Sequence, residues 1–163
     1  MSKKIDFKKI SIHEGPKQSP GFLLWHISTS WRSSIEAVLK TFGLTHPQFV
    51  VLAAIGWLTR NGDFVSQVAI GRMAGLDPNT NSQILKGLEK KSLIKRDQSS
   101  DGRAKNVSLT IKGAEALNQA LPVVEKADVK FFKSLTKNEN NSLTDLFQKL
   151  IPRQSVDTLE VIP

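Results

Sequence analysis

Apolar residues recur at helical spacing along most of the chain. Ser19-Pro20 is typical of an N-cap followed by proline at the first helical position, and the helix that follows is predicted to end at Gly43. Thr45-His46-Pro47-Gln48 predicts a capping box, and the helix that it opens is apolar on nearly every side. Because such a helix has no polar face for water, we expect it to be buried.

Two short helices are predicted next. Ser66 is the expected N-cap of the first, which ends near Gly75, and Asp77-Pro78 caps the second. The second helix is apolar on one side and polar on the other, as in amphipathic helices at a protein surface. Two short helices joined by a tight turn that contains glycine predict a helix-turn-helix.

The remaining pattern predicts a hairpin and two further helices. Residues alternate between apolar and polar on both sides of Ser99-Ser100-Asp101-Gly102, which predicts a β-hairpin. Thr110 caps a long helix over about 111–134, which Pro122 is expected to bend. A last helix over about 137–151 carries one apolar stripe, made of Leu143, Leu146, Phe147, Leu150 and Ile151.

The order of these elements predicts a mainly α fold with a small β-hairpin wing. We expect a winged helix-turn-helix at 45–110, flanked by N- and C-terminal dimerisation helices at 20–44 and 111–151. A basic N-terminal arm (1–19) and a C-terminal tail (152–163) complete the chain. A homodimer is expected because the stripe of the last helix would leave a large apolar patch on a monomer.

Composition narrows the class of protein. The 163 residues are 39% hydrophobic and 23% charged, which is typical of one soluble globular core. The sequence shows neither an apolar run of about 18 residues nor a secretory signal. We therefore expect a cytoplasmic protein with no membrane partner. The chain has no cysteine, and the spacing of His13, His26 and His46 does not suggest a metal pair. We therefore expect no metal and no cofactor.

Positive charge is concentrated in the helix-turn-helix and the hairpin. The chain has a net charge of +8, and residues 66–109 carry eight basic and four acidic side chains. Residues 110–163 carry seven of each and are neutral. A basic excess gathered in one segment indicates a polyanionic partner.

The chain resembles the MarR family of bacterial transcriptional regulators over roughly residues 21–150. Fragments in the right order carry the resemblance: Leu44–Leu52, Gly75–Thr80, Leu88–Arg96, the Asp-x-Arg wing signature at Asp101-Gly102-Arg103, and Leu109-Thr110-Ile111-Lys112-Gly113. Three positions depart from the family pattern. Ser92 stands where glycine is usual, Gly71 where alanine is usual, and Asn81 where an apolar residue is usual.

The resemblance implies a repressor that binds double-stranded DNA as a homodimer on a palindromic operator. The N-terminal residues of a recognition helix reach base edges in the major groove. The side chains placed for this are Asn79, Thr80, Ser82, Gln83 and Lys86. The alternative is an ordinary solvated polar face. Asn81 shares a stripe with Ile84 and Leu88, so packing or capping is as good an interpretation for it as a base contact.

The wing and nearby basic residues are expected to contact DNA beside the major groove. Arg103 at the wing tip is suited to a narrow minor groove, and Asp101 is either its positioning partner or simply a turn residue. Four further cations are candidates for phosphate contacts, although each alone is more often a solvated charge: Arg72, Lys95, Arg96 and Lys105.

Family resemblance also implies a small aromatic acid as effector, bound between the dimerisation helices and the winged helix. The candidate lining residues are Trp25, His26, Trp31 and Trp57. The simpler interpretation is that the tryptophans belong to the core and that His26 is half-buried and hydrogen-bonded.

Two other classes of function fit less well. No nucleophile elbow, P-loop or dinucleotide fingerprint occurs, so we expect no enzyme. A winged helix that serves as a protein–protein interaction module would need an apolar exposed face on its second short helix. Here that face carries asparagine, serine, glutamine and lysine, which favours DNA.

Overall fold

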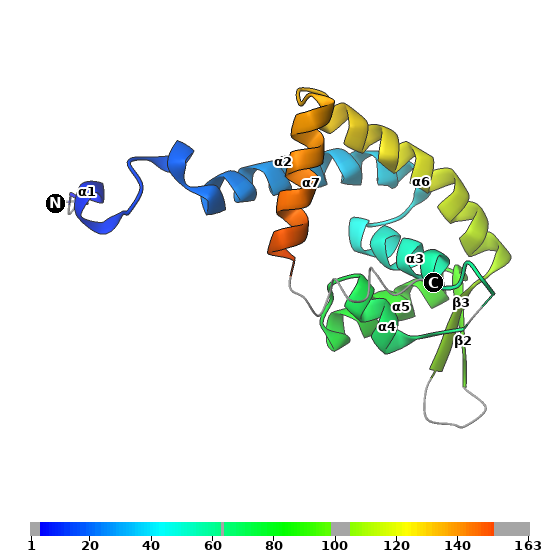
Figure 1. The fold of residues 1–163 in the computed structure, drawn as a ribbon. Helices are drawn as coiled ribbons and strands as arrows, with labels where there is room; N and C mark the ends of the chain where they lie inside the picture. Colours follow the sequence, from blue (N-terminus) through cyan, green and yellow to red (C-terminus); the bar gives the residue numbers. More distant parts are fainter. Residues whose placement is uncertain (1–3, 63, 99–104, 152–163) are drawn as a thin grey trace.

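Helices make up most of the computed structural model, which describes residues 4–62, 64–98 and 105–151 (Figure 1). The longer helices are α2 (Pro20–Leu39), α3 (His46–Leu58), α5 (Pro78–Lys90), α6 (Ile111–Phe131) and α7 (Lys137–Leu150). Shorter elements are α1 (Phe7–Ile10), η1 (Pro16–Gln18), η2 (Lys40–Phe42) and α4 (Gln67–Met73), and the strands are β1 (Val65–Ser66), β2 (Ile94–Gln98) and β3 (Lys105–Leu109). This is the mainly α fold with a small sheet that the sequence predicts.

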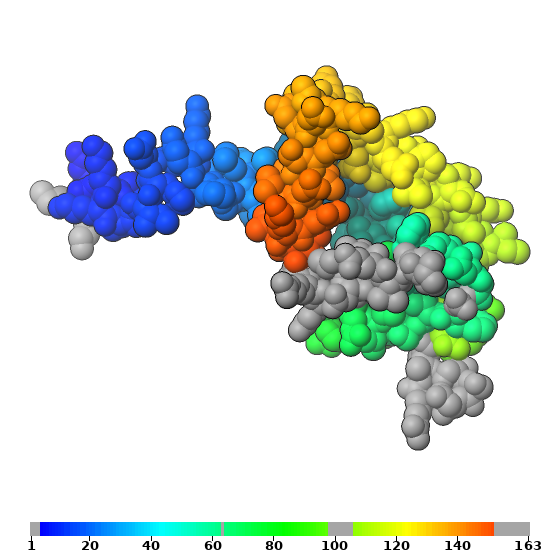
Figure 2. Space-filling view, viewed as in Figure 1, coloured from blue at the N-terminus to red at the C-terminus, as the bar shows by residue number. Residues whose placement is uncertain are grey.

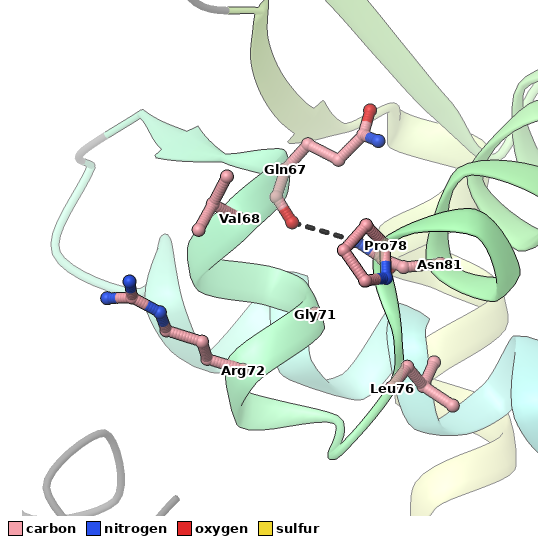
Figure 3. Close-up of a pocket in the computed structure, with 7 residues that line it drawn as sticks. All are labelled: Gln67, Val68, Gly71, Arg72, Leu76, Pro78 and Asn81. Atoms are coloured by element: carbon pink, nitrogen blue, oxygen red, sulfur yellow. Dashed lines mark hydrogen bonds between the residues drawn. The ribbon is translucent and has the colours of Figure 1, made fainter. Parts of the chain in front are cut away.

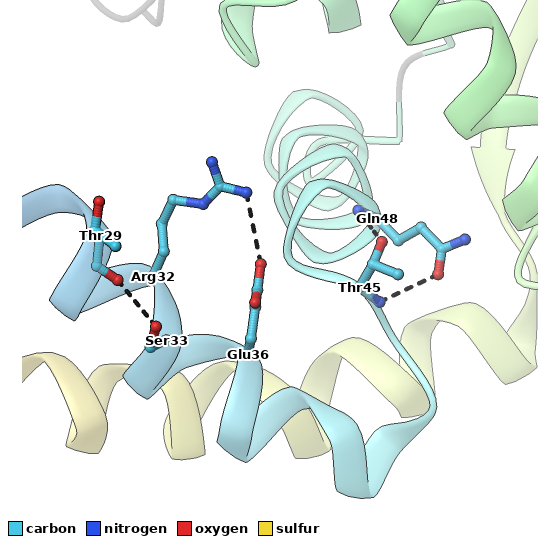
Figure 4. Close-up of polar contacts among 6 residues, drawn as sticks. All are labelled: Thr29, Arg32, Ser33, Glu36, Thr45 and Gln48. Carbon is cyan, nitrogen blue, oxygen red and sulfur yellow. Dashed lines mark hydrogen bonds and ion pairs between the residues drawn. The ribbon is translucent and has the colours of Figure 1, made fainter. Parts of the chain in front are cut away.

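The predicted helix starts are confirmed by their N-cap hydrogen bonds. The Ser19 side chain accepts from the Phe22 amide at the start of α2, and Ser66 and Thr110 cap α4 and α6 in the same way. Thr45 and Gln48 form the predicted capping box at the start of α3 (Figure 4). These local hydrogen bonds fix where each helix begins.

The core is centred on α3. This helix contributes more buried residues than any other described element, and it contacts α2, α4, α5, α6 and β3. Ile35 and Leu39 of α2, Leu85 and Leu88 of α5, and Ala120 and Val124 of α6 complete the core around it. The prediction that this helix is buried is confirmed.

Within the described part of the chain, no single helix is long and apolar enough to cross a membrane. The segments Pro20–Phe42 and His46–Leu58 pass a test of length and composition only as a pair, and that pair bends by 76°.

The sheet has one strand more than predicted. Its order is β1-β3-β2 and both pairings are antiparallel, with Ile94 opposite Leu109 and Val65 opposite Val107. β1 contains two residues, and two residues are too few to show an alternation in the sequence. The turn of the wing, residues 99–104, lies outside the described residues, as does the predicted tail over 152–163.

Other differences concern the ends of the chain. The predicted basic arm contains two short helical elements, α1 and η1, that were not predicted from the sequence. α6 ends at Phe131, a few residues earlier than predicted, and α7 begins with a capping box of Thr136 and Glu139 that the sequence interpretation missed. The apolar stripe of α7 is uncovered within the described chain: Leu146 is 55% exposed and Leu150 is 77% exposed.

The backbone that follows α5 is held against the start of α6. The Leu93 carbonyl accepts from the Thr110 amide at 3.1 Å, and the Thr110 hydroxyl donates to the Ser92 carbonyl at 2.7 Å. Ser92 has a φ of 58°, which explains why glycine is usual at this position in the family. A serine in the left-handed region costs about 1 kcal/mol relative to glycine.

The close approach of the Leu93 carbonyl to the first turn of α6 requires glycine at position 113. A Cβ atom on Gly113 would lie 1.8 Å from the Leu93 carbonyl oxygen, which is backbone and cannot rotate away. We expect Gly113→Ala to lower the free energy of unfolding by about 2 kcal/mol or more, as overpacking does in other cores. Denaturant unfolding measures this loss.

Gly21→Ala is the matched control, because no atom lies within 4 Å of the added Cβ in α2. It should leave stability unchanged or raise it by up to about 1 kcal/mol. Equal losses in the two variants would contradict the proposed clash.

Candidate nucleic-acid interface

The start of α5 is fixed by Asp77. One carboxylate oxygen of Asp77 accepts from the backbone amides of Asn79 and Thr80, each at 3.0 Å, and the other accepts from the Thr80 hydroxyl. The hydroxyl bond from Thr80 is the largest cause of a lowered pKa at Asp77, followed by the Thr80 amide. The carboxylate therefore stays charged at neutral pH. Because the amides of Asn79 and Thr80 donate to Asp77, these two amides are not available to bind a phosphate.

One stripe of α5 faces solvent. Asn79, Gln83, Lys86 and Lys90 are exposed and follow one another at spacings of four, three and four residues. Ile84 on the other side is half-buried, while Leu85 and Leu88 are fully buried. The helix therefore presents amide and ammonium groups outward on a rigid support, and this can offer donors and acceptors to base edges.

Two predicted base contacts have different surroundings from the rest. Thr80 is exposed, but its hydroxyl already donates to Asp77, and Ser82 is only half-exposed. Lys90 was not among the predicted site residues, although it continues the stripe of Gln83 and Lys86. The helical period of the sequence already places it on the same polar side of the helix.

Asn81 is a packing residue rather than part of the exposed stripe. It is 2% exposed, and its Nδ2 donates to the Gln67 carbonyl at 2.8 Å, which ties α5 to the first turn of α4 (Figure 3). Its Oδ1 is buried and has no hydrogen-bond partner among the described residues. The structure thus decides between the two interpretations that the sequence left open.

Gly71 makes room for Asn81. A Cβ atom on Gly71 would lie 3.0 Å from the Asn81 Nδ2 and 3.4 Å from its Cγ. The two departures from the family pattern are therefore in contact across the α4–α5 interface. A cavity of about 340 Å³ lies beside this contact, lined by Gln67, Val68, Gly71, Arg72, Leu76, Pro78 and Asn81 (Figure 3).

The candidate phosphate contacts differ in how available they are. Arg72 is exposed on α4. Lys95 is also exposed, with its Nζ 3.5 Å from an equally exposed Asp97 carboxylate, an arrangement that is worth little energy in water. Lys105 begins β3, opposite Gln98. Its side chain lies outside the described part of the structure, and so do Asp101 and Arg103.

Arg96 has a structural partner. Its Nε donates to the Glu89 carboxylate at 3.0 Å and its Nη2 pairs with the same oxygen, and the side chain is only 11% exposed. The guanidinium fastens β2 to α5. Arg96 therefore forms an ion pair within the protein, whereas the sequence suggested a contact with phosphate.

The four predicted pocket residues make separate contacts. Trp31 donates from Nε1 to Asp128 at 2.7 Å and lies edge-on to His46, while Trp57 is about half exposed with the Arg60 guanidinium 4.3 Å from its ring. His26 contacts Phe22, and Trp25 is 68% exposed. No hydrogen bond or ring contact among the described residues joins these four side chains to one another, so a shared pocket stays a prediction.

His46, which the sequence places in the capping box of α3, is a buried residue at the junction of α2, α3 and α6. Burial lowers the pKa of His46, and the nearby Arg32 lowers it further. Both causes favour the neutral imidazole at pH 7. No group of three or more potential metal ligands comes together in the described part of the chain.

This fold and this exposed helix define a winged helix-turn-helix protein. The family model for MarR matches residues 42–104. The HTH-type transcriptional regulator YdcH of Bacillus subtilis is 39% identical over 131 residues, which are 80% of this chain and 89% of that protein. The chain belongs to the MarR family of transcriptional regulators.

Two solved structures extend the comparison. A mutant of MarR from E. coli in complex with operator DNA has a TM-score of 0.75 and 22% identity, over 91% of this chain and all of that one. The Rv2887 protein of Mycobacterium tuberculosis in complex with salicylic acid has a TM-score of 0.61 and 27% identity, over 81% of this chain and 96% of that one. Rv2887 bears the name HTH-type transcriptional repressor.

The contact between Gly71 and Asn81 predicts a coupled pair. Gly71→Ala should cost about 1–2 kcal/mol of unfolding free energy, because the new methyl group meets the Asn81 amide. In an Asn81→Ala background the amide is gone. The same substitution should then stabilise the protein by up to about 1 kcal/mol, as alanine does in a helix. A double-mutant cycle by chemical denaturation measures the coupling. An equal cost of Gly71→Ala in both backgrounds would show that the two positions are independent.

Proposed function

We propose that this protein is a sequence-specific repressor that binds double-stranded DNA as a homodimer. The observation that carries the proposal is the exposed polar stripe of α5, held on a winged helix whose other side is buried. An α-helix of this kind fits the major groove. A MarR protein of the same fold is solved in complex with operator DNA, which supports DNA binding by this chain.

The homodimer is supported by apolar surface outside the winged helix. The exposed residues of α2 and α7 include Phe22, Leu24, Trp25, Ile27, Leu146, Phe147 and Leu150. A soluble monomer rarely leaves so much contiguous apolar surface in water. Two copies related by a two-fold axis would present two copies of α5 to successive major grooves. The operator is therefore expected to be a pseudo-palindrome.

Some residues are proposed to give specificity for the base sequence, and others to attract the phosphate backbone of DNA. Asn79, Gln83 and Lys86 contact bases, with smaller parts for Thr80 and Ser82 because of their surroundings. Arg72, Lys95 and Lys105 contact phosphates, and Arg103 enters the minor groove with Asp101 as its partner. Arg96 is left out of this set because Glu89 holds it.

The effector is proposed to be a small aromatic acid that releases the repressor from DNA. Support comes from Rv2887, which is solved in complexes with salicylic acid and with p-aminosalicylic acid. Trp31 and its neighbours His46 and Asp128 lie where α2, α3 and α6 meet. A ligand bound there would contact the proposed dimerisation helices α2 and α6 as well as helix α3 of the winged helix-turn-helix. The protein is proposed to work in the cytoplasm, by binding rather than by catalysis.

Selection of bound sequences from a random DNA pool tests the proposal. The expected consensus has dyad symmetry, with half-site centres about 10 bp apart. On the selected operator, Gln83→Ala should cost about 1–3 kcal/mol while binding to random DNA hardly changes. Lys95→Ala should weaken both DNAs alike and reduce the salt slope by about one unit.

Gln119→Ala is the control, since Gln119 is an exposed glutamine on α6, away from α5 and the wing. It should leave both affinities unchanged. A selected pool without an enriched sequence, or without symmetry, would contradict the proposed function.

The wing gives a separate prediction. Arg103→Ala should lose most affinity where the sequence that flanks the half-sites is rich in A·T pairs, because a narrow minor groove attracts the guanidinium. Asp101→Ala should repeat a smaller part of that loss if Asp101 positions Arg103. Affinities of the two single variants and the double variant complete the cycle. Losses that simply add would leave Asp101 as a turn residue.

A further inference from the structure

The N-terminal arm exposes more apolar surface than its length would suggest. The exposed fractions are 64% for Ile5, 69% for Phe7, 72% for Ile10 and 96% for Ile12. Residues 4–19 extend away from the rest of the molecule, beyond the N-terminal end of α2, in the viewing direction that Figures 1 and 2 share. No residue of α1 or η1 is buried in the described structure. Large apolar side chains gathered in this way on a surface indicate a binding site.

The first half of α2 continues this uncovered surface. Phe22, Leu23, Leu24, Trp25 and Ile27 are all more than two-fifths exposed, whereas the buried residues of α2, Ile35 and Leu39, lie at its other end. η1 contacts α2, and Pro20 of α2 follows η1 after the single residue Ser19. The arm and the first half of α2 are therefore adjoining parts of one uncovered segment, here called the strip, in which the polar residues around η1 separate two groups of exposed apolar side chains.

The position of the strip indicates what covers it. The arm leaves the molecule at the level of α2 and α7, while α5 and the strands lie at the opposite side of the molecule (Figure 1). The lysines of the arm would suit DNA, but DNA gives no reason for three isoleucines and a phenylalanine within eight positions. An apolar partner fits these residues better than a polyanion.

We propose that the arm docks on a second copy of this chain, so that the two copies exchange arms across the dimer. The inference rests on the proposed homodimer. A second copy that covers the first half of α2 must lie alongside the arm, because the arm continues from α2 almost without a break. The uncovered stripe of α7, with Leu146, Phe147 and Leu150, is the apolar surface that each copy offers in return. Two-fold symmetry makes the exchange reciprocal.

Arm docking predicts that apolar residues of the arm strengthen the dimer. In the full chain, Phe7→Ser with Ile10→Ser should raise the Kd of dimerisation roughly 100-fold, about tenfold for each anchor. Sedimentation at a series of concentrations in the absence of DNA measures the Kd. Both residues are exposed, so the fold of each copy should keep its unfolding transition.

Lys4→Ser with Lys8→Ser is the matched control, since it places the same two serines beside the apolar anchors. It should change the Kd of dimerisation by less than about threefold, as exposed charges contribute little. A wild-type chain that is monomeric would overturn the homodimer itself. A tight wild-type dimer that both double variants leave unchanged would overturn only the arm exchange. If the lysine variant alone lowers DNA affinity and the dimer is unchanged, the arm is a DNA-binding arm and the proposal is wrong.

Crosslinking locates the arm directly. The chain has no cysteine, so Ile12→Cys provides a single attachment point for a photoreactive label in the arm. Copies labelled with ¹⁵N are mixed with unlabelled copies and irradiated, and crosslinked peptides are identified by mass spectrometry. Arm exchange predicts pairs of mixed isotope that join the arm to α2 or α7. Crosslinks only within one isotopic chain, or none at all, would overturn it.

Discussion

The backbone contact between Leu93 and Gly113 is the constraint on which the arrangement of this molecule depends. α5 ends at Lys90, β2 begins at Ile94 and α6 begins at Ile111, so α5, the β2–β3 hairpin and α6 all meet at this point. Thr110 bonds to the carbonyls of Ser92 and Leu93, and Lys112 bonds to the carbonyl of Lys91 at 3.0 Å. Only glycine at position 113 lets the two backbones approach this closely. The direction of α5 is thereby fixed relative to α6.

A series of packing contacts and hydrogen bonds connects this junction with the proposed dimer surface on α2. α6 packs along α2, and the hydrogen bond from Trp31 to Asp128 joins the two helices near the far end of α6. Lys91 adds a second link from the end of α5, because its Nζ bonds to the Gly43 carbonyl and to Gln48 Oε1, each at 2.7 Å. In the proposed homodimer, these contacts would connect the way in which two copies meet through α2 with the position of each α5. The buried residue His46 and its neighbour Trp31 lie along these contacts, at the place proposed above for the effector.

Local hydrogen bonds explain which parts of the fold could be predicted from the sequence. Ser19, Thr45, Ser66, Asp77 and Thr110 each cap a helix within a few residues of themselves, so their spacing alone identifies them. Arg96 was predicted to contact phosphate because it is a basic residue on the hairpin. Its ion pair with Glu89 of α5 could not be predicted, because only the tertiary structure brings the two side chains together. The aromatic residues of α2 and α3 are a similar case. Helical spacing indicates that they share a face with apolar neighbours, but it contains no information about which of them meet.

Gly71 and Asn81 show how a pair of departures from a family pattern can preserve a structure. Each substitution alone would disturb the α4–α5 interface: glycine leaves a space, and an asparagine brings a polar group into the core. Together, the space left by Gly71 accepts the Asn81 amide, and the amide gains a bond to the Gln67 carbonyl. That bond ties the first turn of α5 to α4, directly beside Asn79 and Thr80. The hydrogen bond therefore positions the start of α5 as well as filling the core. The base contacts proposed for α5 depend on such positioning, because a binding site must hold its side chains within about 0.5 Å.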